Sequence, residues 1–327
     1  MAVERDISTP VLEQIKADFL SGGGLKRKQP IKKVAKLLAD VSGIGGRKTL
    51  LGDDAAVINY GEEFLLLAAD GINLDVFKDY YWAGYCSVLV NVNDIYAMGG
   101  EPIAMVNVIG GESGKIDRIL AGIRAGCKKF AVPMVGGHVH PEPDIREISV
   151  AILGRAKKIL SSFNARCGDD LVLVIDLDGE QYNGSSHWDT TTKKSPQEVI
   201  RRLNMVKNIA EQGLAQAAKD ISNPGVLGTI GMLLETSGLG AEVDLSKIPV
   251  PCHLELRKWL SFYPGFGFIF SVDPKNSAAV CRLFSEVGVG SSVVGRVQRE
   301  PRLILQGTEN SIELMDFRLN HITGIIA

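Results

Sequence analysis

The stretch Val90-Asn91-Val92-Asn93-Asp94-Ile95-Tyr96-Ala97-Met98-Gly99-Gly100 determines how the rest of the chain is interpreted. The apolar pattern over residues 79–98 predicts a long, largely buried helix that ends at the glycine pair. Asn91 and Asp94 are three positions apart, so they share a face near its C-terminal end. Because an unpaired carboxylate is costly in apolar surroundings, Asp94 is a candidate functional residue.

Two further acidic sites precede this helix and border apolar stretches. Asp53 and Asp54 stand before an expected strand over Ala55–Asn59, and Asp70 follows an expected strand over Phe64–Ala69. Acids at the ends of separate elements suggest that their carboxylate oxygens converge on one site. Such a site suits a hard cation, most simply Mg²⁺ carrying the phosphates of a nucleotide. For any one acid taken alone, a helix cap, a turn or a salt bridge is the alternative.

Composition restricts the classes of function. The chain has 327 residues, enough for two domains, and its net charge of −2 comes from 36 basic and 38 acidic residues. This balance gives no general field for nucleic acid or an anionic membrane. No membrane-length apolar run and no signal peptide are evident, which predicts a cytoplasmic protein. The five scattered cysteines predict reduced, mostly buried thiols rather than zinc ligands.

Alternating strand and helix patterns predict an α+β protein with two domains, residues 1–156 and 157–327. The second domain is expected to begin with a strand over Leu171–Asp176. The polar stretch 178–196 is long for a structureless loop, so a functional lid and an exposed insertion are the two interpretations, and the sequence does not identify its role. The other main expected elements are strands over Pro102–Ile109 and Ile148–Gly154 and helices over 9–20, Lys115–Phe130, Pro196–Ala218 and Val226–Thr236.

Two glycine clusters are candidates for close contact with a ligand. Gly22, Gly23 and Gly24 form a flexible segment that, with Lys26, could surround a polyphosphate, although a plain linker explains them equally well. The ending of a Walker P-loop is absent. Gly136-Gly137-His138 follows an apolar stretch, and its glycines suit close backbone approach to a ligand. The nearby Pro141 favours a loop over a strand here.

Together these motifs resemble the aminoimidazole ribonucleotide synthetase (PurM-like) superfamily, whose members include thiamine-monophosphate kinase and selenophosphate synthetase. The similarity covers nearly the whole chain in order. It is carried by Gly52–Val57, by Asp70, by Asn91–Pro102 with Asn93 in place of a serine, by Gly136-Gly137-His138, and by Asp220-Ile221-Ser222.

The resemblance implies a two-domain α+β fold: a strand-rich N-terminal domain for dimerisation and ATP, and a C-terminal α/β sandwich domain that binds substrate. It implies a homodimer and the cofactors ATP and Mg²⁺. Asp53, Asp54, Asp70, Asp94 and Asp220 are the metal ligands that it implies, with Asp220 from the second domain. Gly22, Gly23, Gly24, Asn91, Gly136, Gly137 and His138 would line the nucleotide site, and Lys26 and Asp94 would be catalytic.

Departures from the individual members narrow the chemistry. The glycine loop has Ser21 where selenophosphate synthetase carries a reactive thiol. A further member, a hydrogenase-maturation dehydratase, uses a C-terminal cysteine that is absent here. The chain is therefore most similar to the synthetase-related subgroup. The resemblance implies an ATP- and Mg²⁺-dependent phosphoryl-transfer enzyme acting on a small metabolite that the motifs do not identify. The alternative is a dimeric nucleotide-binding sensor or scaffold without turnover.

Overall fold

A computed structural model describes residues 7–42, 51–140 and 147–326 of the chain. The chain forms two compact units. The five-stranded unit comprises Asp54–Ile159 and Thr191–Glu211. The seven-stranded unit comprises the described residues up to Asp53, together with Leu160–Thr190 and the residues from Gln212 onward. Because the units are built from interleaved segments, the domain division after residue 156 stays a prediction.

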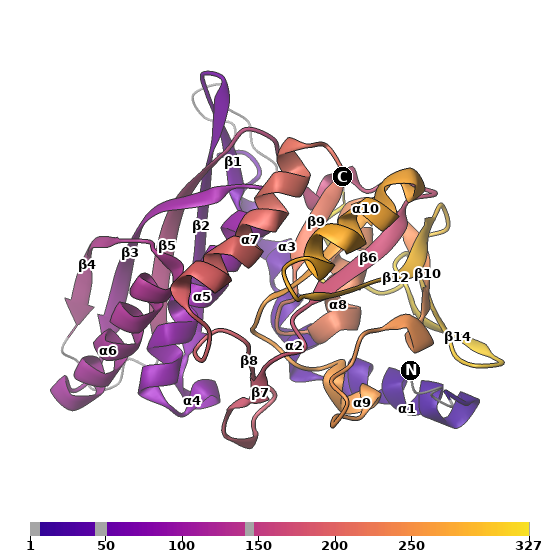
Figure 1. Cartoon of the computed structure of the whole chain (residues 1–327), viewed down its shortest axis with the longest axis horizontal. Helices are drawn as coiled ribbons and strands as arrows, with labels where there is room; N and C mark the ends of the chain where they lie inside the picture. The colour runs from indigo at the N-terminus through magenta and orange to yellow at the C-terminus, as the bar shows by residue number, and fades with distance from the viewer. Residues whose placement is uncertain (1–6, 43–50, 141–146, 327) are drawn as a thin grey trace. The chain divides into compact units, whose positions relative to one another are not determined.

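The five-stranded unit is a mixed sheet with the strand order β1-β2-β5-β3-β4, in which only β3 and β4 run parallel. Figure 1 shows helices α5 and α6 on the same face of this sheet. The strands are β1 (Ala56–Tyr60), β2 (Glu63–Asn73), β3 (Glu101–Gly110), β4 (Met134–His140) and β5 (Glu147–Ala156). The helices are α4 (Leu74–Phe77), α5 (Tyr80–Ala97), α6 (Ser113–Phe130) and α7 (Pro196–Glu211).

Alternation along the strands separates the two faces of this sheet. Leu66, Ile152 and Met105 on neighbouring strands are buried toward the helices. The opposite face carries Leu67 and Val106, which are 47% and 43% exposed. Antiparallel strands normally place polar residues on a face that meets water. On this face the exposed side chains Leu67 and Val106 are apolar instead.

Helix α5 confirms the predicted buried helix over 79–98. The side chain of Asp79 caps its first turn by accepting a hydrogen bond of 2.9 Å from the backbone N–H of Tyr81. At the other end Gly99 adopts a φ of +82°, which only glycine tolerates easily, and the chain turns into β3. Local capping therefore fixes where the helix ends and where Asp94 lies.

Two glycines let α5 and α6 pack backbone against backbone. A Cβ atom on Gly84 of α5 would come within 2.2 Å of the Ile119 carbonyl oxygen, and one on Gly122 of α6 would come within 1.9 Å of the Tyr81 carbonyl oxygen. Real Cβ atoms do not approach that closely. The two helices therefore form one layer whose position on the sheet is narrowly fixed.

Polar contacts attach α7 to the five-stranded unit. Glu101 at the start of β3 forms ion pairs with Arg155 of β5 and Lys207 of α7, and these cations hold the pKa of Glu101 below its usual range. The hydroxyl of Tyr96 donates a hydrogen bond of 3.2 Å to Asn204 of α7. Burial raises the pKa of Tyr96, so this hydroxyl stays a donor at neutral pH.

The seven-stranded unit is a mixed sheet with the strand order β14-β13-β10-β12-β6-β11-β9, accompanied by a small hairpin, β7-β8. The strands are β6 (Asp170–Ile175), β7 (Glu180–Gln181), β8 (Trp188–Asp189), β9 (Ala217–Asp220), β10 (Gly240–Asp244), β11 (Gly267–Val272), β12 (Gly290–Gln298), β13 (Arg302–Gln306) and β14 (Ser311–Asp316). The α-helices are α1 (Thr9–Ser21), α2 (Gly23–Lys28), α3 (Ile31–Leu38), α8 (Gly225–Thr236), α9 (Leu256–Trp259) and α10 (Pro274–Ser285), with short 3-10 turns at Ser162–Asn164, Tyr182–Gly184 and Leu245–Lys247.

Both faces of this second sheet are buried along β6, β11 and β9. Leu171 and Leu173 of β6 belong to one hydrophobic core, which also contains the large apolar side chains of α8 and residues of α1. Helix α10 contacts β6 and β12, and its Phe284 packs against Phe270 of β11 with ring centroids 5.9 Å apart. A sheet with helices against both faces is a sandwich, as predicted for the second domain.

Some predicted elements were wrong. The segment around Gly136-Gly137 is strand β4, not a loop, because it pairs with β3 along its length. The helix expected over Pro196–Ala218 ends at Glu211, and strand β9 follows it. The polar stretch 178–196 contains the β7-β8 hairpin. Among the cysteines Cys86 is buried, but Cys167 and Cys252 are exposed.

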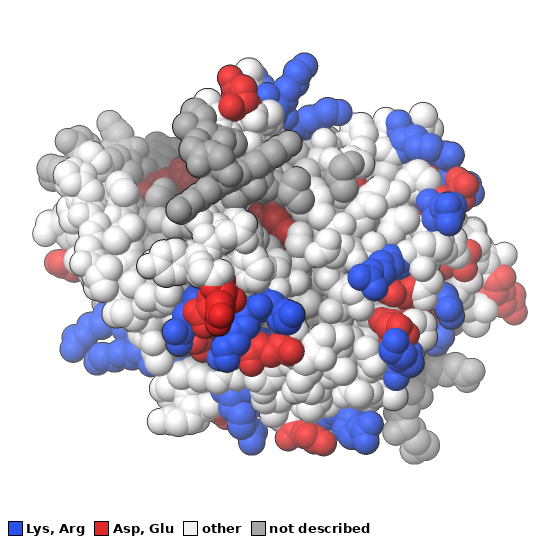
Figure 2. All heavy atoms as spheres, turned by 90° about the horizontal axis from the view of Figure 1, so that it is seen from above, with Lys and Arg blue, Asp and Glu red and all other residues white. Residues whose placement is uncertain are grey.

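Figure 2 shows Lys and Arg side chains interspersed with Asp and Glu side chains on the face that it displays. None of the helices in the described part of the chain is both long and apolar enough to cross a membrane.

Candidate functional site

Asp54 and Asp94 come together in the five-stranded unit. Asp54 precedes β1 and Asp94 lies on the last turn of α5, and a carboxylate oxygen of one lies within 4.8 Å of a carboxylate oxygen of the other. Two like charges at that separation repel by about 3–4 kcal/mol at an effective dielectric constant of about 20. A divalent cation between them reverses the sign of this interaction, which makes the pair a candidate metal site.

Asn91 adds a second observation on the same helix face, one turn before Asp94. Its side chain is completely buried, and its amide nitrogen donates a hydrogen bond of 2.8 Å to the Ser87 carbonyl oxygen. Its Oδ1 atom has no hydrogen-bond partner among the residues that the structure describes. A buried amide oxygen without a partner is costly, so this atom fits a role as an acceptor for a ligand or a metal-bound water.

Small residues bring the C-terminal end of α5 down onto the sheet. A Cβ atom on Gly154 of β5 would come within 2.5 Å of Ile95 Cγ2, and one on Gly100 would come within 2.4 Å of Leu66 Cδ1. The helix end therefore sits directly against β2 and β5. This contact fixes the height of Asp94 above the sheet and its approach to Asp54.

Two other predicted acids have different surroundings. Asp70 is exposed on β2, accepts a hydrogen bond of 2.7 Å from the Gly71 backbone N–H, and does not join Asp54 and Asp94 within 4.8 Å. Asp53, in the seven-stranded unit, accepts hydrogen bonds of 2.6 Å from the Ser161 hydroxyl and 3.1 Å from the Ser162 backbone N–H. Asp53 therefore binds the start of the 3-10 turn Ser162–Asn164, and its role as a metal ligand stays a prediction.

The N-terminal glycines form a helical corner instead of an irregular loop. Gly22 separates α1 from α2, and Lys26 is exposed on α2. A Cβ atom on Gly24 would come within 2.5 Å of the Asn223 carbonyl oxygen. Gly24 is thus required where α2 packs against the turn before α8, so the glycine cluster contacts the turn that follows the Asp220-Ile221-Ser222 motif.

Asp220 is the last residue of β9 and is 6% exposed. The turn after it leads into α8, and its Asn223 has a buried Oδ1 atom without a hydrogen-bond partner among the described residues. Sequence reasoning missed this orphan acceptor. An asparagine before a Pro-Gly step indicates a cap, but α8 begins at Gly225 without a side-chain cap.

Gly136, Gly137 and His138 lie on β4, at the opposite edge of the sheet from β1. Four strand spacings of about 4.8 Å place these two strands roughly 19 Å apart. A Cβ atom on Gly137 would come within 2.2 Å of Asn107 Oδ1 on β3. The structure therefore does not bring this motif together with Asp54 within one chain.

Comparison with known proteins gives the family. The AIR synthase related protein N-terminal domain matches residues 52–156, and the corresponding C-terminal domain matches residues 166–308. The chain belongs to the AIR synthase-related family. The resemblance seen in the motifs is thereby confirmed, and so is the predicted two-domain PurM-like α+β fold.

Relatives of this AIR synthase-related protein extend over most of its length. It is 44% identical over 279 residues to the uncharacterized protein MJ0640 of Methanocaldococcus jannaschii, covering 84% of this chain and 86% of that protein. The solved structure of AaThiL complexed with AMPPCP and TMP has a TM-score of 0.65 at 19% identity, covering 88% of this chain and 97% of that one.

The structure of T. maritima PurL complexed with ADP has a TM-score of 0.70 at 20% identity over 85% of this chain. The AIR synthase-related chain spans about half (47%) of the length of that PurL chain. At these identities the structural likenesses establish the fold alone. The PurM-like superfamily to which the AIR synthase-related domains belong consists of ATP-dependent enzymes.

Proposed function

We propose that this protein is an ATP- and Mg²⁺-dependent phosphoryl-transfer enzyme that acts on a small metabolite. The observation that carries the proposal is the pair Asp54 and Asp94, with the orphaned Asn91 Oδ1 atom one helical turn away. Carboxylate and amide oxygens are the hard donors that Mg²⁺ selects, and Mg²⁺ usually keeps several waters and bridges to substrate phosphates. The donor set therefore fits magnesium and a nucleotide better than zinc or copper.

The residues would act mainly by binding and positioning. When bound, Mg²⁺ neutralises charge on the phosphate oxygens and aligns them for transfer. Asp54 and Asp94 hold the cation, and Asn91 accepts a hydrogen bond from its hydration shell or from the nucleotide. Lys26 offers a positive charge for the transferred phosphoryl group. Because positioning and electrostatics supply most of the acceleration in this chemistry, no strong general base is required.

We further propose that the working unit is a homodimer formed through the open sheet face. Leu67, Val106 and Val108 project from this face and are between 43% and 47% exposed. Contiguous exposed apolar residues of this kind mark interaction surfaces. A second copy also offers a way for Gly136-Gly137-His138 to reach a nucleotide, because the motif lies at the far edge of its own sheet.

For the remaining predicted metal ligands, we propose the roles that the resemblance implies. Asp70 and Asp220 are proposed to bind metal once Mg-ATP is present, and Asp53 to support them. Substitution of each by asparagine, followed by titration of Mg-ATP, separates a ligand from a structural acid. Only a ligand loses affinity while the melting temperature of the free protein is retained.

Binding and turnover can be tested separately. Calorimetric titration of the full chain with ATP is expected to give binding with Mg²⁺ present and much weaker binding with EDTA. Phosphorus NMR of protein, Mg-ATP and pools of small metabolites is then expected to show a new phosphate resonance that depends on one pool. Binding without any new resonance would favour the sensor alternative, and no binding would remove both functions.

A further inference from the structure

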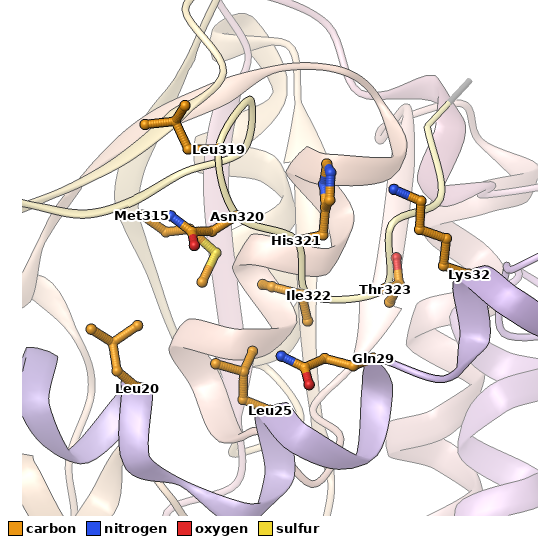
Figure 3. A pocket seen from close by; sticks show the side chains of 10 residues that line it. All are labelled: Leu20, Leu25, Gln29, Lys32, Met315, Leu319, Asn320, His321, Ile322 and Thr323. Carbon is orange, nitrogen blue, oxygen red and sulfur yellow. The ribbon is translucent and has the colours of Figure 1, made fainter.

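A cavity of about 420 Å³ opens in the seven-stranded unit between the N-terminal helices and the segment after β14 (Figure 3). Its apolar lining includes Leu25, Met315 and Ile322, and Lys32 and His321 add polar groups. Sites for small molecules span about 300–1,000 Å³ and combine an apolar lining with a few polar groups. The cavity therefore has the size and the lining of a small-molecule site.

One wall of the cavity is anchored by a buried carboxylate. Glu235 of α8 is 1% exposed and accepts hydrogen bonds from the backbone N–H groups of Ile322 (3.0 Å), Thr323 (2.7 Å) and Gly324 (3.2 Å). The Thr323 hydroxyl donates a further bond of 2.7 Å. Four donors on one carboxylate fix this segment firmly, so the wall is preorganised rather than shaped by a ligand.

The His321 ring lies beside the same anchor. Its Nδ1 atom lies 3.3 Å from Glu235 Oε1, so that side of the ring faces the carboxylate. The side chain of His321 is 34% exposed, which leaves the rest of the ring accessible from the cavity. Sequence reasoning missed this arrangement, although a single acid within the apolar helix Gly225–Thr236 was a signal, because a buried acid needs partners.

Lys32 supplies the positive charge of the cavity. A Cβ atom on Gly324 would come within 2.5 Å of Lys32 Cδ, so the aliphatic stem lies against the anchored segment. No ion pair or hydrogen bond of Lys32 occurs within the described ranges 7–42, 51–140 and 147–326. Figure 3 shows the ends of Lys32 and His321 at the same side of the cavity. A cation beside an apolar lining suits an anion with an apolar body.

The cavity lies entirely outside the domains shared with the family. The family domains match residues 52–156 and 166–308, whereas every lining residue precedes residue 52 or follows residue 308. We propose that this cavity binds a small organic anion, a carboxylate or a phosphate monoester with an apolar body. Its residues are distinct from Asp54, Asn91 and Asp94, so the proposal does not depend on the phosphoryl-transfer function.

The test uses the full chain with ¹³C-methyl methionine, because Met315 lines the cavity and reports locally. Hexanoate and hexyl phosphate are the probes, and hexanol is their uncharged match. We expect the anions to shift the Met315 resonance in a saturable manner and to bind at least about tenfold more tightly than hexanol. Met232, buried in the hydrophobic core, is the internal control. The anion that binds more tightly identifies the head group as carboxylate or phosphate.

Two variants make the assignment to Lys32 specific. Lys32→Met keeps the aliphatic stem that packs on Gly324 and is expected to weaken anion binding at least about tenfold, whereas hexanol affinity stays unchanged. Lys33→Met removes an exposed charge from the same helix outside the cavity and is expected to leave both affinities unchanged. An unchanged chemical shift of the Met315 methyl group in each variant without ligand verifies that the variant is folded. Equal loss in both variants, hexanol as tight as the anions, or no shift of Met315 would overturn the proposal.

Discussion

Asp94, on the last turn of α5, places a carboxylate oxygen within 4.8 Å of one from Asp54, which precedes β1. The two residues belong to different elements, and only the packing of the helix end on the sheet brings them together. The pair is the basis of the proposed magnesium site, and it can be tested without knowing the substrate.

Asp94→Asn is expected to weaken Mg-ATP binding by about tenfold or more. Even outer partners of metal ligands cost 10–100-fold in affinity when removed, so a direct ligand should cost at least as much. Calorimetric titration measures the change. Asp117→Asn, on the exposed side of α6, is the matched control and should bind normally. Equal affinities of the Asp94 variant and the wild type would remove the metal site.

Val108→Lys is expected to convert a dimer into monomers. The side chain stands on the open apolar face of the five-stranded sheet, and a lysine there would bury its charge in the proposed interface. Analytical ultracentrifugation gives the mass of each species. The control is Leu120→Lys, at an apolar residue of α6 that is 41% exposed. A wild type that sediments as a monomer at micromolar concentration would contradict the proposal directly.

Gly122→Ala is expected to destabilise the five-stranded unit by about 1–3 kcal/mol, as overpacking of a tight interface does. The added methyl group would lie within 1.9 Å of the Tyr81 carbonyl oxygen. Gly114→Ala, in the first turn of the same helix, meets nothing within 4 Å and should change stability by less than about 0.5 kcal/mol. Differential scanning calorimetry compares the two. A neutral Gly122 variant would show that the helices can separate at little cost.

Stability is expected to fall as the pH decreases from 6.5 to 4, partly because of His187. Burial lowers the pKa of His187 to about 4, so the unfolded chain binds its proton first as the pH falls. The folded protein is therefore more stable above pH 6.5 than at lower pH. Protonation of the unfolded chain at this histidine lowers the free energy of unfolding by about 3 kcal/mol between pH 6.5 and pH 4.

His187→Gln removes the titrating group and should flatten this part of the pH profile of the melting temperature. The exposed His253 gives the matched control, His253→Gln, which should keep the wild-type slope. Parallel profiles for wild type and His187→Gln would mean that the imidazole is as easily protonated in the folded protein as in the unfolded chain.

The sequence alone was sufficient to predict α5, because its signals are local. An apolar run and a glycine pair after it indicate a helix without reference to distant residues. The same is true of the order of the motifs, which gave the family and the α+β class. Asp94 was identified for the same reason, as an acid at the end of an apolar element.

Strand pairing decided what these signals could not. The backbone of β4 is a strand only because β3 offers it partners, and Pro141 nearby pointed to a loop. The strand order also places Gly136-Gly137 at the opposite edge of the sheet from β1, the strand that Asp54 precedes. The number of residues between two motifs does not predict such a separation in space.

The sequence by itself determined the capped helix, the acidic motifs and the family, since these depend on residues close together in the chain. Only the tertiary structure decided that Asp54 meets Asp94, that Gly24 packs on Asn223, and that Glu235 anchors the segment at Thr323. Each of these contacts joins residues far apart in sequence. Such contacts arise from packing and sheet order, and local patterns carry no information about either.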